Sequence, residues 1–257
     1  MTVDENSPAR PPQEGPSFYA QPGFLRRTPL RQWWTVLHPP YTALHLSLVT
    51  IGGCLSGPVN TVTLVVTIGA FFLAVGVGAH ALDEVNGRPL GTTIPRSHLI
   101  AAALVGLGGA VTLGIVGMFV VSPYLGIFIV VGVVIAVGYN LEFFGGYLHT
   151  PVVLILGWGA FPILTANFAQ HDALSIASLV AVLFGALITK IQQVLSTPAR
   201  DLRRRVDSVE GVLVRFDGTS SPLTKASLLQ PLEQGLKVLC WSGVAIALSL
   251  VLLRIHG

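Results

Sequence analysis

Two polar stretches interrupt an otherwise apolar chain, and the first of them, residues 76–95, combines carboxylates with an arginine. His80, Asp83 and Glu84 occur at helical spacings of three and four residues, so they share one face of a helix. Arg88 follows one turn later. Carboxylate oxygens suit Mg²⁺, which proteins bind through one or two carboxylates plus substrate phosphates, and a guanidinium suits bidentate contact with phosphate. This pattern indicates a site for a phosphorylated ligand.

The second polar stretch, residues 190–205, lies far downstream and has the same character. Gln193, Thr197 and Asp201 recur at spacings of four along one helical face. The neighbouring row holds three more polar residues: Gln192, Ser196 and Arg200. Polar side chains that extend so far into an apolar segment are expected to line a cavity or a helix contact. Lys190, deeper still, is expected to pair with a carboxylate or to contact an anionic ligand.

Composition determines the kind of fold that must position these residues. The chain has 257 residues, of which 52% are hydrophobic and 11% charged, whereas soluble domains average about 25% charged. Apolar runs of roughly 18 residues or more recur, long enough to cross a hydrocarbon core of about 30 Å. They do not alternate with polar residues, which disfavours a β-barrel. We therefore expect an all-α, polytopic transmembrane helix bundle in a lipid bilayer.

Seven segments have the length of a membrane span. They are about 40–57, 61–82, 98–119, 123–140, 151–168, 174–196 and 238–254. Residues 1–30, rich in proline and polar residues, are expected to form a disordered tail, and residues 31–257 the transmembrane domain.

The basic residues predict the orientation of the bundle. The tail and the loops after the second and sixth spans hold thirteen of the fifteen Lys and Arg residues. Basic loops stay in the cytoplasm, so the N-terminus and both polar stretches are predicted to be cytoplasmic. The fourth span ends on the same face, at Tyr139 and Glu142. The net charge of +3 is explained by this bias, and we expect no nucleic-acid partner.

Several charged residues also have a simpler interpretation. An Asp-Glu pair can mark a helix end in the headgroup layer, and residues 203–205, three arginines, are typical of an inner-face cluster on anionic lipid. Five histidines are isolated from any partner at metal-ligand spacing, and we expect them to be interfacial or packing residues: His38, His45, His98, His149 and His171.

The two stretches resemble the motifs of the UbiA superfamily of membrane prenyltransferases. That family has Asn-Asp-x-x-Asp-x-x-x-Asp at the inner end of its second span, followed by Arg-Pro-(Leu/Ile)-x-(Ser/Thr)-Gly. Residues 79–87 and 88–95 correspond to these motifs. The family's Asp-x-x-Asp-x-x-x-Asp after the sixth span corresponds to residues 198–205. The middle aspartates are kept, as Asp83 and Asp201, while other residues stand at the outer positions: His80, Gly87, Pro198 and Arg205.

The residues and the resemblance together predict the roles within the site. Catalytic roles are expected for Asp83, Asp201, His80 and Tyr139. The resemblance implies Mg²⁺ held by Asp83, Glu84 and Asp201. Contacts to substrate are expected from Arg88, Lys190, Gln193, Thr197, Arg200, Arg205 and Glu142. We expect three aromatic rings to stabilise a carbocation by cation–π contact: those of Tyr139, Trp158 and Phe161.

The function implied by the resemblance is ionisation of an isoprenyl diphosphate and transfer of the prenyl group to a lipophilic acceptor, at the cytoplasmic face. A second interpretation is a UbiA-type terpene cyclase, which acts on the prenyl diphosphate alone and needs no acceptor. A third is a non-catalytic lipid-binding or transport relative, which the four missing carboxylates favour.

Overall fold

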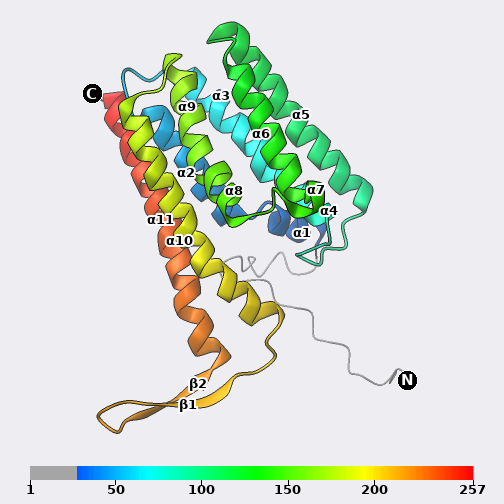
Figure 1. Cartoon of the computed structure of the whole chain (residues 1–257), viewed down its shortest axis with the longest axis vertical. Helices are drawn as coiled ribbons and strands as arrows, with labels where there is room; N and C mark the ends of the chain where they lie inside the picture. Colours follow the sequence, from blue (N-terminus) through cyan, green and yellow to red (C-terminus); the bar gives the residue numbers. More distant parts are fainter. Residues whose placement is uncertain (1–27, 257) are drawn as a thin grey trace.

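The computed structural model describes residues 28–256, so most of the expected tail, residues 1–30, lies outside the described part. The chain is a helix bundle with one small hairpin (Figure 1). The first helices are α1 (Pro29–Val36), α2 (Pro39–Cys54), α3 (Thr61–Phe71), the π-helix η3 (Phe72–Ala79) and α4 (His80–Val85). Next come α5 (Arg96–Val120), α6 (Leu125–Asn140), α7 (Phe143–Gly146), α8 (Pro151–Ile155) and the π-helix η4 (Leu156–Ala160). The last are α9 (Phe161–His171), α10 (Ile176–Arg204), strands β1 (Glu210–Val214) and β2 (Ser220–Thr224), and α11 (Lys225–His256).

Within residues 28–256, five helices are long and apolar enough to cross a membrane, as the sequence predicts. They are Thr61–Val85, Arg96–Val120, Pro151–His171, Ile176–Arg204 and Lys225–Ile255, the first and third of which join shorter elements end to end. The other two predicted spans are also helical, but α2 and α6 have 16 residues each. At about 1.5 Å per residue they reach about 24 Å, less than the hydrocarbon thickness of about 30 Å. The count of seven spans therefore stays a prediction.

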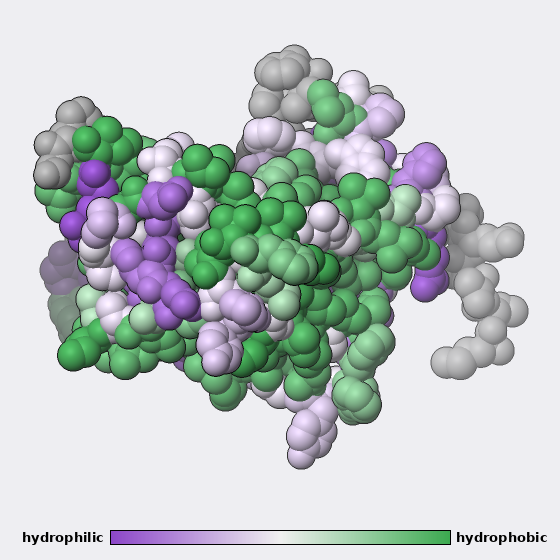
Figure 2. Space-filling model, turned by 90° about the horizontal axis from the view of Figure 1, so that it is seen from above, coloured by the Kyte–Doolittle hydropathy of each residue, from purple (hydrophilic) through white to green (hydrophobic). Residues whose placement is uncertain are grey.

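Helix α2 lies at the centre of one half of the bundle, packed against α9 and α11. Its Leu48 and Ile51 form a buried cluster with Ile163 of α9. In the other half, α5 packs along η3, α4 and α6. Hydrophobic residues cover most of the surface visible in Figure 2, and hydrophilic residues gather in separate patches, as expected for helices that face lipid.

Glycine permits the closest helix crossing, between η4 and α10. A Cβ atom added at Gly185 would lie 2.3 Å from the carbonyl oxygen of Gly159, and one added at Gly159 would lie 2.4 Å from that of Gly185. Small residues allow such an approach in lipid, where packing drives helix association. This crossing fixes the position of α10 against the rest of the bundle.

The basic segments gather at one end of the bundle, where α1, the loop after α4 and the last turns of α10 lie (Figure 1). Helix α10 continues to Arg204, beyond the predicted end at residue 196, and α11 begins at Lys225 rather than near residue 238. The two helices extend past the bundle and are joined by the antiparallel hairpin β1–β2. Residues 197–204 therefore continue helix α10 beyond the predicted membrane span.

Candidate functional site

Side chains from three parts of the chain gather at this end of the bundle. Asp83 of α4 interacts electrostatically with Arg200 and Arg204 of α10. His38, in the link between α1 and α2, interacts with the same two arginines and with His80. We call these five residues the inner cluster. Asp83 is half-buried, whereas both arginines are exposed and thus accessible to an anionic ligand.

The two histidines of the inner cluster are in direct contact. The rings of His38 and His80 lie edge to face with their centroids 4.8 Å apart. His38 has left-handed backbone angles, φ 44° and ψ 57°, a conformation that costs a non-glycine residue about 1–2 kcal/mol. Two prolines follow it and begin α2.

Burial lowers the pKa of His38 well below its usual value of 6.5. Its neighbours His80, Arg204 and Arg200 lower the pKa in the same direction, because each disfavours a second positive charge. His38 is therefore neutral near pH 7, and Asp83 remains the acidic partner of the two arginines.

In the first polar stretch, the charged side chains of Glu84 and Arg88 form hydrogen bonds with the loop that follows α4. Both carboxylate oxygens of Glu84, a fully buried residue, accept hydrogen bonds: from the amide of Leu90 at 3.0 Å, and from the amide and hydroxyl of Thr92 at 2.9 and 2.7 Å. Arg88 donates to the carbonyls of Thr92 and Ile94 at 2.7 and 2.9 Å. The roles expected for Glu84 and Arg88 therefore compete with a structural role in which these groups are already bonded.

In the second stretch, Asp201 and Arg205 interact with each other at the surface. They form an exposed pair on α10, with Arg205 Nη1 3.5 Å from Asp201 Oδ1. Arg203 pairs with Glu233 of α11 and joins these two helices. Within residues 28–256, Asp83 interacts with Arg200 and Arg204 and has no described interaction with Asp201, so the approach of Asp83 to Asp201 stays a prediction.

The remaining polar residues expected to bind substrate lie at the surface of α10 and after α6. Lys190 donates a hydrogen bond to Oε1 of Gln193 at 3.2 Å, in an exposed contact. Thr197 and Glu142 are exposed, and Glu142 has a left-handed backbone with φ 51°. None of these four residues has a described contact with Asp83 among residues 28–256.

The aromatic residues lie between the inner cluster and the middle of the bundle. Tyr139 stacks on His149, with ring centroids 4.3 Å apart, and packs at 4.8 Å against Trp158. Tyr139 also interacts electrostatically with Asp83 and Arg200. Phe161 lies deeper, 6.2 Å from Phe71 between ring centroids. Tyr139 and Trp158 thus lie near the charged end, and Phe161 lies toward the middle of the bundle.

The magnesium site implied by the resemblance stays a prediction, and two of its three expected ligands have other partners. Within residues 28–256, no group of three or more His, Cys, Asp and Glu side chains is arranged to hold a metal ion. Of the three expected ligands, Glu84 is bonded within its loop and Asp201 is paired with Arg205. Of these three residues, only Asp83 belongs to the inner cluster, which also contains two arginines. An anion bound there would therefore meet more guanidinium groups than carboxylates.

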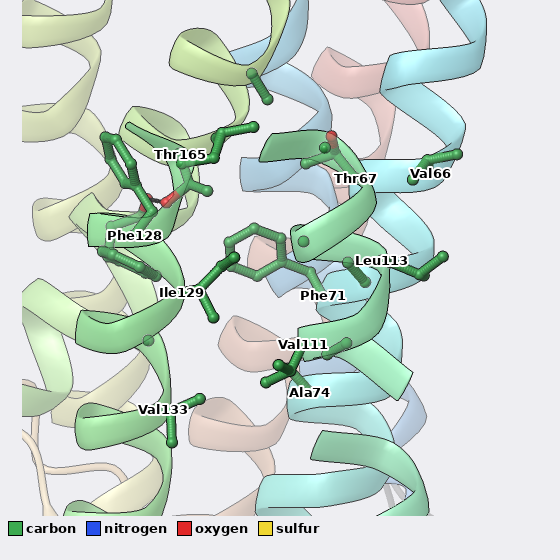
Figure 3. A pocket seen from close by; sticks show the side chains of 18 of the residues that line it. Val66, Thr67, Phe71, Ala74, Val111, Leu113, Phe128, Ile129, Val133 and Thr165 are labelled. Carbon is green, nitrogen blue, oxygen red and sulfur yellow. Dashed lines mark hydrogen bonds between the residues drawn. The ribbon is translucent and has the colours of Figure 1, made fainter. Parts of the chain in front are cut away.

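A cavity of about 290 Å³ lies in the middle of the bundle (Figure 3). Its wall comes from α2, α3, η3, α5, α6, η4 and α9, and it is almost entirely apolar. Figure 3 shows Phe71 projecting toward the side that carries Phe128, Ile129 and Thr165. Trp158 and Phe161 belong to the same wall.

No family model, curated protein or solved structure matches this chain. The resemblance to the UbiA superfamily thus rests on the motifs alone.

Sequence reasoning missed two members of the inner cluster, His38 and Arg204. The sequence predicts a packing role for His38, which has no partner nearby in the chain, because its contact with His80 spans 42 positions. It predicts a lipid contact for Arg204, but Arg204 lies four residues after Arg200, and this helical spacing places both on one face.

Proposed function

We propose that this protein is an intramembrane enzyme that binds an isoprenyl diphosphate at the inner cluster and transfers the prenyl group to a lipophilic acceptor. The observation that carries the proposal is the electrostatic interaction of Arg200 and Arg204 with Asp83, near the packed rings of Tyr139 and Trp158. Guanidinium groups make strong, bidentate hydrogen bonds to phosphate oxygens. With the N-terminus in the cytoplasm, the site opens to the inner leaflet, where a prenyl chain can remain in lipid.

In the proposed reaction, the bond between the allylic carbon and the diphosphate oxygen breaks, and its electron pair leaves with the diphosphate. Arg200 and Arg204 stabilise the negative charge that develops on the leaving group. Tyr139 and Trp158 lie where aromatic faces can shelter the allylic cation. The acceptor forms the new bond, and Asp83 receives the proton that the acceptor loses.

A second candidate is a non-catalytic protein that binds phosphorylated isoprenoids. It is favoured by the positions of Glu84 and Asp201, which leave one carboxylate at the inner cluster. The arginines would then serve for binding alone.

One assay separates these candidates and the cyclase. Purified protein in lipid nanodiscs is incubated with farnesyl and geranylgeranyl diphosphate, with and without long-chain phenols as acceptors and with and without Mg²⁺. Prenylated phenol, reduced about 100-fold or more by Asp83→Asn, supports the transferase. A cyclic product without acceptor indicates the cyclase. Binding without release of diphosphate under any condition would overturn the enzymatic proposal and support the second candidate.

A further inference from the structure

The central cavity contains one buried polar group that the proposed function does not use. His45 of α2 belongs to the cavity wall and is 5% exposed. Its Nδ1 lies 3.2 Å from the carbonyl oxygen of Trp158. A carbonyl only accepts hydrogen bonds, so Nδ1 carries the proton and Nε2 of the neutral ring is an acceptor.

The acceptor nitrogen Nε2 of His45 is buried and has no hydrogen-bond partner within the described part of the chain. A buried polar atom without a partner costs about 1–3 kcal/mol, and such atoms are rare in folded proteins. The neighbouring ring of Phe71, 5.6 Å away between centroids, supplies no donor. A bound molecule with a hydroxyl group would satisfy this nitrogen.

The rest of the wall selects for an apolar molecule. Two of its threonines already donate their hydroxyl protons along their own helices, Thr67 to Thr63 at 2.7 Å and Thr165 to Phe161 at 2.8 Å. At the end of the bundle opposite the inner cluster, the wall includes the exposed side chains of Val62 and Val120, so the cavity reaches the lipid-facing surface.

The volume sets the size of the occupant. A dry cavity of roughly 150 Å³ binds one benzene molecule, so about 290 Å³ accommodates roughly twelve carbon atoms. We propose that the cavity is a binding site for an apolar alcohol or phenol of this size, which enters from the bilayer and donates its hydroxyl to Nε2 of His45. The site shares Trp158 with the proposed function but no residue with the inner cluster, so it can be tested without an isoprenyl diphosphate.

The test compares two probes that differ in one hydroxyl, 4-hexylphenol and hexylbenzene. Their binding to the full chain in nanodiscs is measured with radiolabelled compounds, after subtraction of binding to empty nanodiscs. Wild type is expected to bind 4-hexylphenol about three- to tenfold more tightly than hexylbenzene, because one hydrogen bond typically contributes this gain in affinity. His45→Phe should abolish this preference for the phenol.

Two further variants keep the test decisive if His45→Phe folds poorly. Ala110→Leu fills the cavity from α5 and should weaken the binding of both probes at least tenfold, with His45 intact. Val105→Leu, on the exposed side of the same helix, is the matched control and should change neither. Equal binding of the two probes by wild type, or full binding by Ala110→Leu, would overturn the proposal and leave water as the partner of Nε2.

Discussion

The loop after α4 and the last turns of α10 carry similar residue types, but they use their charges in opposite ways. Glu84 and Arg88 are bonded to amides, a hydroxyl and carbonyls of their own loop. Arg200 and Arg204 extend from a continuous helix toward Asp83 of another element. The difference arises because a turning loop leaves backbone groups unpaired, which charged side chains then satisfy, whereas a helix pairs its own backbone.

Residue spacing identifies the face of a helix on which a side chain lies but not the partner of that side chain. Asp83 and Glu84 are adjacent in sequence, yet one faces α10 and the other is buried under its loop.

The largest effect is expected for Glu84→Ala. The substitution leaves the amides of Leu90 and Thr92 without their acceptor, and bonds to a charged group are worth about 1.5–3 kcal/mol each. We expect a loss of about 3 kcal/mol in the free energy of unfolding, measured by SDS titration in mixed micelles. A stable Glu84→Ala protein that has lost only ligand affinity would show that Glu84 belongs to the binding site, and the two stretches would then be equivalent.

An intermediate effect is expected from a change in pH, through His38, which interacts with His80 of the first stretch and with Arg200 and Arg204 of the second. Because its pKa is below 6.5 in the folded protein, the unfolded chain takes up the proton first as the pH falls. His38 should therefore contribute a loss of about 1 kcal/mol in stability between pH 6.5 and 5.5. His38→Asn, which tolerates the left-handed backbone, should remove this contribution and reduce the slope, whereas His98→Asn, at the exposed start of α5, should not. An unchanged slope in His38→Asn would contradict the burial of a neutral histidine.

The smallest effect is expected for Asp201→Asn. The Asp201–Arg205 pair is exposed, with side chains 53% and 83% accessible, so its loss should cost less than about 0.5 kcal/mol. Binding of an isoprenyl diphosphate, followed by isothermal titration calorimetry, should also stay within twofold. A large loss of affinity in Asp201→Asn alone would restore Asp201 to the site predicted from the motif.

The sequence predicted the helical, membrane-type fold because long apolar runs leave few alternatives. It also located Asp83 and Arg200 correctly at the same end of the bundle. It could not predict the bonds of Glu84, because those depend on how residues 86–95 turn, nor the contact of His38 with His80, which is made by tertiary packing. The hairpin had a readable signal that was overlooked, an Asp217-Gly218 turn between two strand-like runs.

The most direct test of the account concerns the arginines of α10. The dissociation constant of an unreactive isoprenyl diphosphate analogue is measured in nanodiscs for wild type, the double variant Arg200→Ala/Arg204→Ala, and Arg205→Ala. The account predicts at least a 100-fold loss of affinity in the double variant, since two charge-assisted contacts are removed, and less than a twofold change in Arg205→Ala. Equal affinities in all three proteins, or a comparable loss in Arg205→Ala, would contradict it.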